Sequence, residues 1–340
     1  MNNTLVTLIG GGGFVGRYVA QTLLKAGARV RIAQRDPRQA WFLKPLGGLG
    51  QTQFVAADVR KPETVARAVQ GADAVVNLVG TLSGDFEGCH VAGARAVADA
   101  CAAAGVPALV HVSALGADPE SESRYGRTKG EGEAAVRAAF PTATIIRPSI
   151  VFGREDRFTN RFAEMISRAT AMPLVHVVPV LRPDVKFQPV FVADLAAAVV
   201  RALGEPGRFG GRTFELGGPD IVTMRELLHW IARETCRKPS FVELSDTIGG
   251  AIAKAGFLPG APITRDQWLM LQHDNVVSEG AGGFAEFGIV PTPMAAVAPG
   301  WLVQFRRNGR FADVDRAAVI ERSGQDPHHV ERTVDIDRAA

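Results

Sequence analysis

The stretch LVTLIGGGGFVGRYVA at residues 5–20 decides the fold of this chain. Its mostly apolar residues 5–9 predict a buried strand, which stops at four glycines before a helical pattern begins. Gly10, Gly13 and Gly16 have the spacing of a phosphate-binding turn, in which bare backbone amides approach a pyrophosphate and the helix packs closely on the strand. The free N–H groups at the helix start then face the anion. We predict a dinucleotide-binding turn, with an ordinary glycine-rich turn as the alternative.

Strands and helices alternate after this turn. Apolar strands are predicted at 28–35, 51–58, 72–80, 107–115 and 142–153, with helices between them at 62–71, 88–104 and 123–139. Near-continuous apolar strands separated by helices are typical of a parallel sheet that is covered on both faces. The predicted fold class is α/β, a Rossmann-type doubly wound parallel sheet. Its dinucleotide-binding domain is expected over residues 1–153, with the sheet completed by parts of 187–216.

The pattern loosens after residue 153. A smaller, loop-rich C-terminal lobe for substrate or docking is expected over 154–311, beginning with an amphipathic helix at 154–169. Thr223 and Glu226 predict a capping box at the start of another helix. The helix at 154–169 carries three arginines that form a solvated face or grip a partner: Arg154, Arg157 and Arg161.

The end of the chain offers two further alternatives. Six aromatic residues form either an exposed docking patch or a satellite core under loops: Phe257, Trp268, Phe284, Phe287, Trp301 and Phe305. Residues 312–340 are highly charged and carry few large apolar side chains, so we expect a mobile tail rather than an extended docking arm.

Composition excludes several classes of protein. The 340 residues are 46% hydrophobic and 21% charged, which supports a substantial core. A net charge of +3 is too small to argue for nucleic-acid binding, and three scattered cysteines indicate a reducing compartment without a structural metal. Neither a signal peptide nor an apolar run of transmembrane length is found. We expect a cytoplasmic protein whose membrane association, if any, comes through a partner or a surface patch; its oligomeric state is not indicated.

The end of the second strand bears on which nucleotide is bound. Arg35 is placed to pair with a ribose 2′-phosphate, and Arg17 follows the last glycine of the turn near the same corner. Two guanidinium groups favour NADP(H) over NAD(H). Asp36 carries the alternative, since it could accept the ribose 2′-hydroxyl or simply cap the turn before Pro37.

Two other strand ends are expected to line the cofactor. Asp58 and Val59 are placed at the adenine edge, and residues 77–80 are placed where the chain passes close to the nucleotide. The predicted cofactor contacts are Gly10, Gly13, Phe14, Val15, Gly16, Arg17, Arg35, Asp58, Val59, Leu78, Val79, Gly80, Ser113, Tyr125, Lys129 and Pro148.

A Y-x-x-x-K pattern points to redox chemistry. Tyr125 and Lys129 are four residues apart on a predicted helix and therefore share a face. A lysine cation near a phenol favours the phenolate and lowers a pKa that starts near about 10. Such a tyrosine exchanges a proton with a substrate oxygen while hydride moves to or from nicotinamide. The alternatives are an exposed helical pair, or a lysine that binds the nicotinamide ribose.

These motifs together resemble the extended or atypical short-chain dehydrogenase/reductase superfamily over about residues 1–240. Three runs resemble the nucleotide-binding accessory subunit of respiratory complex I and its bacterial relatives more closely: HVSAL at 111–115, SRYGRTK at 123–129 and FGREDRF at 152–158. This resemblance implies a tightly held NADPH, a peripheral position on the complex near its quinone end, and no established turnover. A start directly at the first strand suits a bacterial member, on the cytoplasmic face of the inner membrane.

One position departs from the active superfamily members. They carry Ser or Thr after the fifth strand, where this chain has Leu115, although Ser113 lies two residues earlier on the same face. The candidate catalytic residues are thus Tyr125, Lys129 and Ser113. The favoured hypothesis is an accessory subunit with a structural NADPH. The alternatives are an NADPH-dependent reductase or a nucleotide-sugar epimerase or dehydratase, and a nucleotide sensor that shares the site.

Overall fold

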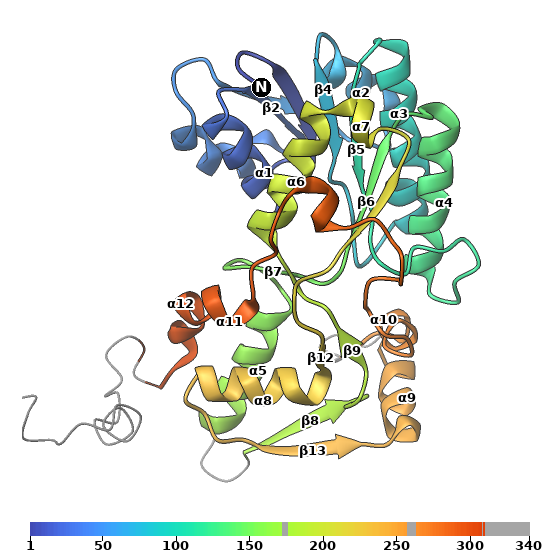
Figure 1. The fold of residues 1–340 in the computed structure, drawn as a ribbon. Helices are drawn as coiled ribbons and strands as arrows, with labels where there is room; N and C mark the ends of the chain where they lie inside the picture. Colours follow the sequence, from blue (N-terminus) through green and yellow to red (C-terminus); the bar gives the residue numbers. More distant parts are fainter. Residues whose placement is uncertain (172–175, 257–262, 308, 310–340) are drawn as a thin grey trace, which may run out of the picture.

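A seven-stranded parallel sheet forms the upper part of the molecule (Figure 1). The computed structural model describes residues 1–171, 176–256, 263–307 and 309. Along the sheet the strand order is β11-β6-β5-β4-β1-β2-β3, with every neighbouring pair parallel. The strands are β1 (Leu5–Ile9), β2 (Arg29–Gln34), β3 (Thr52–Ala56), β4 (Ala74–Asn77), β5 (Leu109–Val112), β6 (Thr144–Pro148) and β11 (Thr213–Leu216). The predicted Rossmann-type α/β fold is confirmed, and β11 joins the sheet from far along the chain.

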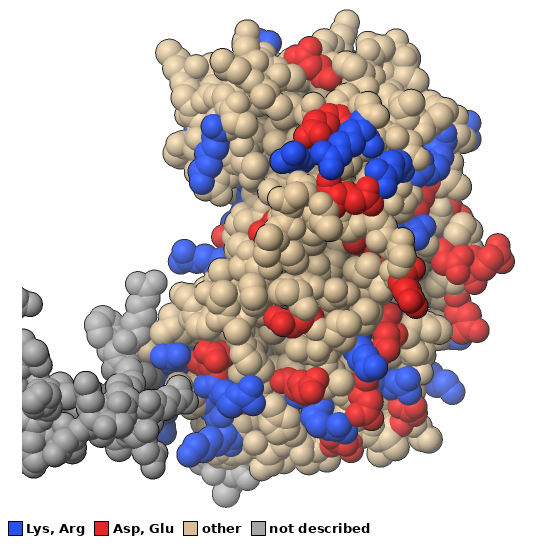
Figure 2. Space-filling model, in the orientation of Figure 1, with Lys and Arg blue, Asp and Glu red and all other residues tan. Residues whose placement is uncertain are grey.

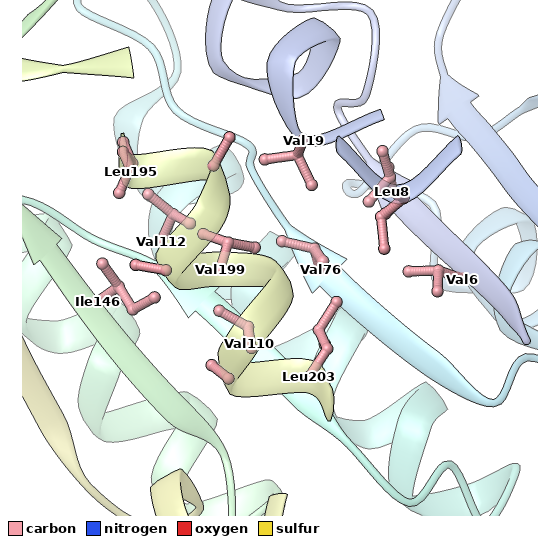
Figure 3. Packing of buried hydrophobic residues seen from close by; sticks show 14 of the residues in the cluster. Val6, Leu8, Val19, Val76, Val110, Val112, Ile146, Leu195, Val199 and Leu203 are labelled. Carbon is pink, nitrogen blue, oxygen red and sulfur yellow. The ribbon is translucent and has the colours of Figure 1, made fainter. Parts of the chain in front are cut away.

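Helices cover both faces of this sheet. On one face lie α1 (Phe14–Lys25) and α6 (Val192–Gly204), and on the other lie α2 (Pro62–Val69), α3 (Gly93–Ala103) and α4 (Arg124–Ala139). Figure 3 shows Leu195, Val199 and Leu203 of α6 directed at apolar side chains of the strands. Because both faces are covered, β4 and β5 are buried along their whole length, which is why their sequences lack polar alternation.

Two predicted helices differ in the structure. The helix expected at 88–104 begins as a π-helical segment, η2 (Glu87–Ala92), before α3 continues it. The helix expected at 154–169 is α5 (Thr159–Ala171), and it begins five residues late because the buried Asp156 carboxylate closes a turn. That carboxylate accepts hydrogen bonds from the Gly153, Phe158 and Asn160 N–H groups and the Thr159 hydroxyl. The interpretation of Arg154, Arg157 and Arg161 as one helical face is therefore wrong, since only Arg161 lies on α5.

The lower part of the molecule is built from short elements (Figure 1). Three two-stranded sheets pair β7 (Val151–Phe152) with β10 (Val190–Phe191), β9 (Lys186–Phe187) with β12 (Val222–Thr223), and β8 (Val177–Leu181) with β13 (Ser240–Leu244). A separate core packs α5 and β8 against α8 (Met224–Glu234). The remaining helices are α7 (Pro206–Phe209), α9 (Asp246–Lys254), α10 (Arg265–Met270), α11 (Met294–Val297) and α12 (Pro299–Leu302), with 3-10 turns η1 (Pro37–Leu46), η3 (Phe284–Phe287) and η4 (Val303–Phe305). The capping box of Thr223 and Glu226 at the start of α8 is confirmed.

The aromatic residues of the C-terminal region are core residues. Phe287 of η3 is fully buried in the main core, with its ring 4.6 Å from that of Phe209 and 4.8 Å from that of Phe214. Phe284 is buried beside it, and Trp301 and Phe305 pack on the lower core. The docking-patch interpretation is wrong for Phe284 and Phe287, whose rings are buried between elements, whereas Trp301 and Phe305 are half-buried. Phe257 and the predicted tail at 312–340 lie outside the described residues.

Replacing Phe287 by alanine tests how far η3 belongs to the main core. Phe287→Ala is expected to lower the free energy of unfolding by about 3–5 kcal/mol, because it leaves a cavity among stacked rings. Val290→Ala is the matched control, since Val290 is 89% exposed, and a change within about 0.5 kcal/mol is expected. Urea unfolding measures both variants. A loss below about 1 kcal/mol for Phe287→Ala would contradict its place in this core.

Candidate functional site

The glycine turn joins β1 to α1 at the carboxyl edge of the sheet. Gly10 has φ +82° and its N–H donates to the Ala33 carbonyl at 2.8 Å. A Cβ on Gly10 would lie 3.3 Å from the Leu78 carbonyl carbon and from the Val79 side chain. A Cβ on Gly16 would lie 2.5 Å from the Gly11 carbonyl oxygen, in backbone that has no room to move. Gly10 is thus required by conformation and close approach, and Gly16 by the packing of helix on turn.

The residues after β4 connect this turn to α4. Leu78 and Val79 lie against Gly10, and a Cβ on Gly80 would lie 3.6 Å from the Lys129 ammonium nitrogen. The strand order reverses between β1 and β4, and open α/β sheets bind ligands at the carboxyl ends of strands at this position. The fold therefore brings the glycine turn, residues 78–80 and Lys129 together at one edge.

Ser113 and Lys129 supply buried polar groups at this edge. The Lys129 ammonium donates to the Val112 carbonyl at 3.2 Å, and the Ser113 N–H donates to the Ile146 carbonyl at 2.7 Å. The Ser113 hydroxyl is buried, and within the described part of the chain it has no hydrogen-bond partner. An unpaired buried hydroxyl costs roughly 1–3 kcal/mol. This hydroxyl and the Cβ-free turn fit a polar, phosphate-bearing cofactor.

Tyr125 does not have the lowered pKa that the sequence suggests. Burial raises the pKa of Tyr125 to about 12 and lowers the pKa of Lys129 to about 8, the latter against the opposing effect of Glu133. The prediction that Lys129 lowers the Tyr125 pKa is therefore wrong, because desolvation of the phenolate dominates. The Tyr125 ring packs edge-on against His90, at 5.5 Å between ring centres, and Phe86, at 6.4 Å. At neutral pH Tyr125 is a neutral phenol.

His90 is a structural member of the site that the sequence did not reveal. Its Nε2 accepts the Thr81 N–H at 3.0 Å, which places the ring proton on Nδ1, 2.9 Å from the Thr128 hydroxyl. The residue ties the segment after β4 to α4, and it projects from the π-helical η2, a conformation that often occurs at functional sites. A lone histidine among small residues carried no signal of this role.

His111 is a second buried imidazole beneath the site. Its Nδ1 lies 3.1 Å from the Asn77 side-chain nitrogen, across the β4–β5 pair. Burial lowers the pKa of His111 to about 3, and burial with the nearby Lys129 charge lowers the pKa of His90 to about 4. Both imidazoles are therefore neutral at physiological pH.

The second lobe reaches the start of α4 through Asp266. Its carboxylate, on α10, accepts the Arg124 N–H at 2.6 Å and the Tyr125 N–H at 3.2 Å. Ser123 caps the same helix by accepting the Gly126 N–H at 3.2 Å. The predicted helix start was evident in Ser123, but a contact across more than 140 residues could not be found from the sequence.

Arg35 and Arg17, the two arginines expected near the ribose 2′-phosphate, differ in the contacts that they make. Arg35 is exposed and forms no ion pair or hydrogen bond within the described part of the chain. Arg17 is committed: its guanidinium lies 3.0 Å from Glu155 and 4.5 Å above the Phe42 ring centre. The Tyr18 hydroxyl also donates to Glu155, at 2.8 Å. Arg35 is therefore the exposed arginine of the two, while Arg17 is paired with Glu155 and keeps only a buried Nε without a partner among the described residues.

The aspartates of this corner are also occupied. Asp36 takes the capping alternative, since its carboxylate accepts the Arg38 N–H at 3.1 Å at the start of η1. Asp58 pairs with Arg60 at 2.7 Å, mainly through a side-chain hydrogen bond that lowers the pKa of Asp58 to about 2.

The other predicted contacts are apolar. Phe14 lies beside Gly153, and Val15 packs on the main core. Val59 is buried against Gly93. Pro148 ends β6, and its carbonyl accepts the Leu115 N–H.

A cleft of about 560 Å³ is lined by residues around the carboxyl end of β11 and η3, including Glu215, Gly217, Phe284 and Ile289. None of the predicted site residues lines it. Within residues 1–171, 176–256, 263–307 and 309, no group of His, Cys, Asp or Glu is arranged to hold a metal ion. Over the same residues, no helix has the length and apolar character needed to cross a bilayer.

Protonation of His90 makes stability depend on pH. Its pKa is about 4 in the folded protein and about 6.5 when unfolded, so the unfolded chain binds more protons below pH 6.5 and stability falls as pH falls towards 4. Between pH 7 and pH 5 this effect amounts to about 2 kcal/mol. His90→Gln is expected to lose that part of the pH dependence in urea unfolding. The exposed His229→Gln should keep the wild-type slope, and an identical slope in all three proteins would contradict the account.

Comparison with known proteins shows the family to which this chain belongs. Residues 10–165 match the NAD(P)H-binding family model, so the chain carries an NAD(P)H-binding domain. The chain is 34% identical to NADH dehydrogenase [ubiquinone] 1 alpha subcomplex subunit 9 of Arabidopsis thaliana, over 91% of this chain and 80% of that protein. It is 32% identical to a ceramide reductase of Caulobacter vibrioides, over 71% of this chain and 74% of that protein.

A solved structure confirms the fold. An NADPH-dependent quinone oxidoreductase of Escherichia coli superposes with a TM-score of 0.70 at 21% identity, covering 87% of this chain and 99% of that one. With the Rossmann sheet and the glycine turn, these similarities show that the chain belongs to the family of NADH dehydrogenase [ubiquinone] 1 alpha subcomplex subunit 9.

Proposed function

We propose that this chain is an accessory subunit of respiratory complex I that holds NADPH as a resident cofactor with little or no turnover. The observation that carries the proposal is the combination of a glycine turn without room for side chains and a tyrosine that is a poor proton acceptor. The proposed cradle consists of this turn, Arg35 and the unpaired Ser113 hydroxyl, whereas the half-buried Tyr125 has a pKa of about 12. The similarity to a relative named as a subunit of NADH dehydrogenase [ubiquinone] supports the proposed assembly into complex I.

The residues of the cradle have distinct roles in holding the cofactor. The amides of the glycine turn would face the pyrophosphate, and Arg35 would pair with the ribose 2′-phosphate. Lys129, beside Gly80, would hold the nicotinamide ribose, and Ser113 would donate to a polar group at the buried end. A bound nicotinamide dinucleotide supplies hydride chemistry. Because ligand that binds only the folded state adds stability, a retained cofactor also stabilises the subunit.

The lack of a side-chain hydrogen-bond donor at Leu115 is the reason why we expect slow substrate turnover. A substrate oxygen that gains negative charge needs preorganised donors, and each missing donor costs roughly 3–4 kcal/mol of barrier. Leu115, which stands where active superfamily members carry a hydroxyl, offers only an apolar side chain. Its N–H is already bonded to Pro148. The Tyr125 pKa of about 12 leaves even less phenolate at neutral pH than a free tyrosine would have, which makes Tyr125 a poor base.

A reductase is the second candidate, favoured by the Ser113 hydroxyl. A neutral Tyr125 can still donate a proton to a carbonyl oxygen, and Ser113 can hydrogen-bond that oxygen. The similarity to a ceramide reductase supports this alternative. It requires NADPH oxidation that depends on a carbonyl substrate and is lost in Tyr125→Phe.

Blue-native electrophoresis of gently solubilised membranes tests the accessory role. We expect this chain to comigrate with complex I. We also expect the purified chain to leave NADPH unoxidised when quinones or long-chain ketones are added. The proposed place of the subunit is the cytoplasmic face of the membrane. Migration of the whole population as a free protein would contradict the accessory role. Substrate-dependent oxidation that Tyr125→Phe abolishes would establish the reductase instead.

Arg35 is predicted to select the phosphorylated nucleotide. Removing a guanidinium that pairs with phosphate costs about 1.5–3 kcal/mol, so Arg35→Ala is expected to weaken NADPH binding roughly 10- to 100-fold. NADH affinity should change little, because NADH lacks the 2′-phosphate. Arg38→Ala is the matched control, since Arg38 is also exposed but is bonded to Asp36. Isothermal titration measures both nucleotides, and equal losses for NADPH and NADH would contradict the assignment.

A further inference from the structure

The 3-10 segment η1 and the turn after it have apolar side chains on both sides. On the inner side, Ala40 and Leu43 are fully buried in the main core. On the outer side, the exposed fractions are 57% for Trp41, 45% for Phe42, 44% for Leu46 and 107% for Leu49. We call these four outer residues the η1 face. The inner residues hold the segment on the domain, so burial in the domain itself does not explain the outer ones.

The η1 face is a concentration of exposed apolar side chains. Ten large hydrophobic residues are exposed in the described part of the chain, and four of them fall within the nine residues 41–49. Exposed apolar residues scattered singly are ordinary on protein surfaces, whereas a contiguous patch marks an interaction site. None of the four is among the predicted cofactor contacts, although Phe42 lies under the Arg17 guanidinium.

The η1 face is held in place rather than loose. The Asp36 carboxylate caps the start of η1, and Pro37 and Pro45 restrict its backbone. The Arg17 guanidinium lies over the Phe42 ring, at 4.5 Å. Docking through a preformed surface loses less conformational entropy than docking through a segment that must first be ordered.

Positive charge surrounds the η1 face. Lys44 is exposed within the η1 face and Arg38 at the start of the same segment, where Arg38 is paired with Asp36, the one acidic residue between 35 and 50. Arg35, also exposed, is the group proposed to meet the cofactor phosphate, so Lys44 is the cation that this segment leaves for a headgroup. Figure 2 shows the upper-left part of the molecule, where the N-terminal elements lie, as largely tan with a few blue atoms of Lys or Arg. The surface is thus apolar and basic, which complements anionic headgroups above hydrocarbon.

We propose that the η1 face docks this protein on an anionic lipid bilayer, with Trp41 and Phe42 at the headgroup level and Leu49 below it. Tryptophan and basic side chains at the edge of an apolar surface are typical of interfacial binding. Leu49 is fully exposed and protrudes, which suits insertion into lipid, and Lys44 would be unusual within the core of a protein interface. Through the Arg17–Phe42 contact, the bilayer would lie beside the first turn of α1.

Co-sedimentation of the full chain with vesicles tests this proposal. We expect binding to phosphatidylcholine vesicles that contain phosphatidylglycerol, weaker binding to phosphatidylcholine alone, and a decrease as salt is raised. Leu49→Ser should weaken binding about tenfold or more, and Lys44→Glu should reduce the preference for anionic vesicles several-fold. Val290→Ser is the matched control because Val290 is also highly exposed, at 89% against 107% for Leu49, but lies outside the η1 face.

Tryptophan fluorescence adds a readout specific to this face. The emission of the wild type should shift to shorter wavelength on anionic vesicles, and Trp41→Phe should remove most of that shift while still binding. Unfolding free energies and NADPH affinities of the variants should match the wild type, which separates this proposal from the proposed nucleotide site.

Three outcomes would overturn the proposal. The first is no preference for anionic vesicles, and the second is equal binding by Leu49→Ser and Val290→Ser. The third is Leu49→Ser binding vesicles normally while losing comigration with complex I, which would assign the η1 face to a protein partner.

Discussion

The backbone contact between Gly16 and Gly11 is the constraint on which the structure depends. A single methyl group at Gly16 would lie 2.5 Å from the Gly11 carbonyl oxygen, so α1 can approach the turn only because no side chain is present. That approach directs the first amides of α1 at the carboxyl edge of the sheet, next to residues 78–80. The remaining polar groups of the site are Ser113, which follows the end of β5, and Lys129, which lies near the start of α4.

Burial then determines what these groups can do. The same low-dielectric surroundings raise the pKa of Tyr125, lower that of Lys129 and keep His90 and His111 neutral. An environment of this kind strengthens hydrogen bonds to a bound nucleotide, yet it disfavours the phenolate that proton abstraction requires. The tightly held cofactor and slow chemistry that we propose would follow from the same set of contacts.

The sequence predicted what local pattern determines and failed where distant contacts decide. Apolar strands and the glycine spacing were sufficient for the Rossmann sheet, and Ser123 and Thr223 marked helix starts correctly. The delayed start of α5 depended on the hydrogen bonds of one buried carboxylate, Asp156. The Tyr125 pKa depends on burial, which the spacing of residues along a helix does not reveal. The contact of Asp266 with the start of α4 could not be predicted either, because Asp266 belongs to a separate lobe. The exposure of Trp41 and Phe42 could not be predicted from the sequence, because it depends on which side of η1 packs on the domain through Ala40 and Leu43.

Mass spectrometry of the nucleotide released from this chain, purified from its native membranes without added cofactor, tests the central claim most directly. The account predicts close to one NADPH per chain, carrying the 2′-phosphate that Arg35 is left free to meet. Recovery of NAD(H) in that amount, or of no dinucleotide at all, would contradict it.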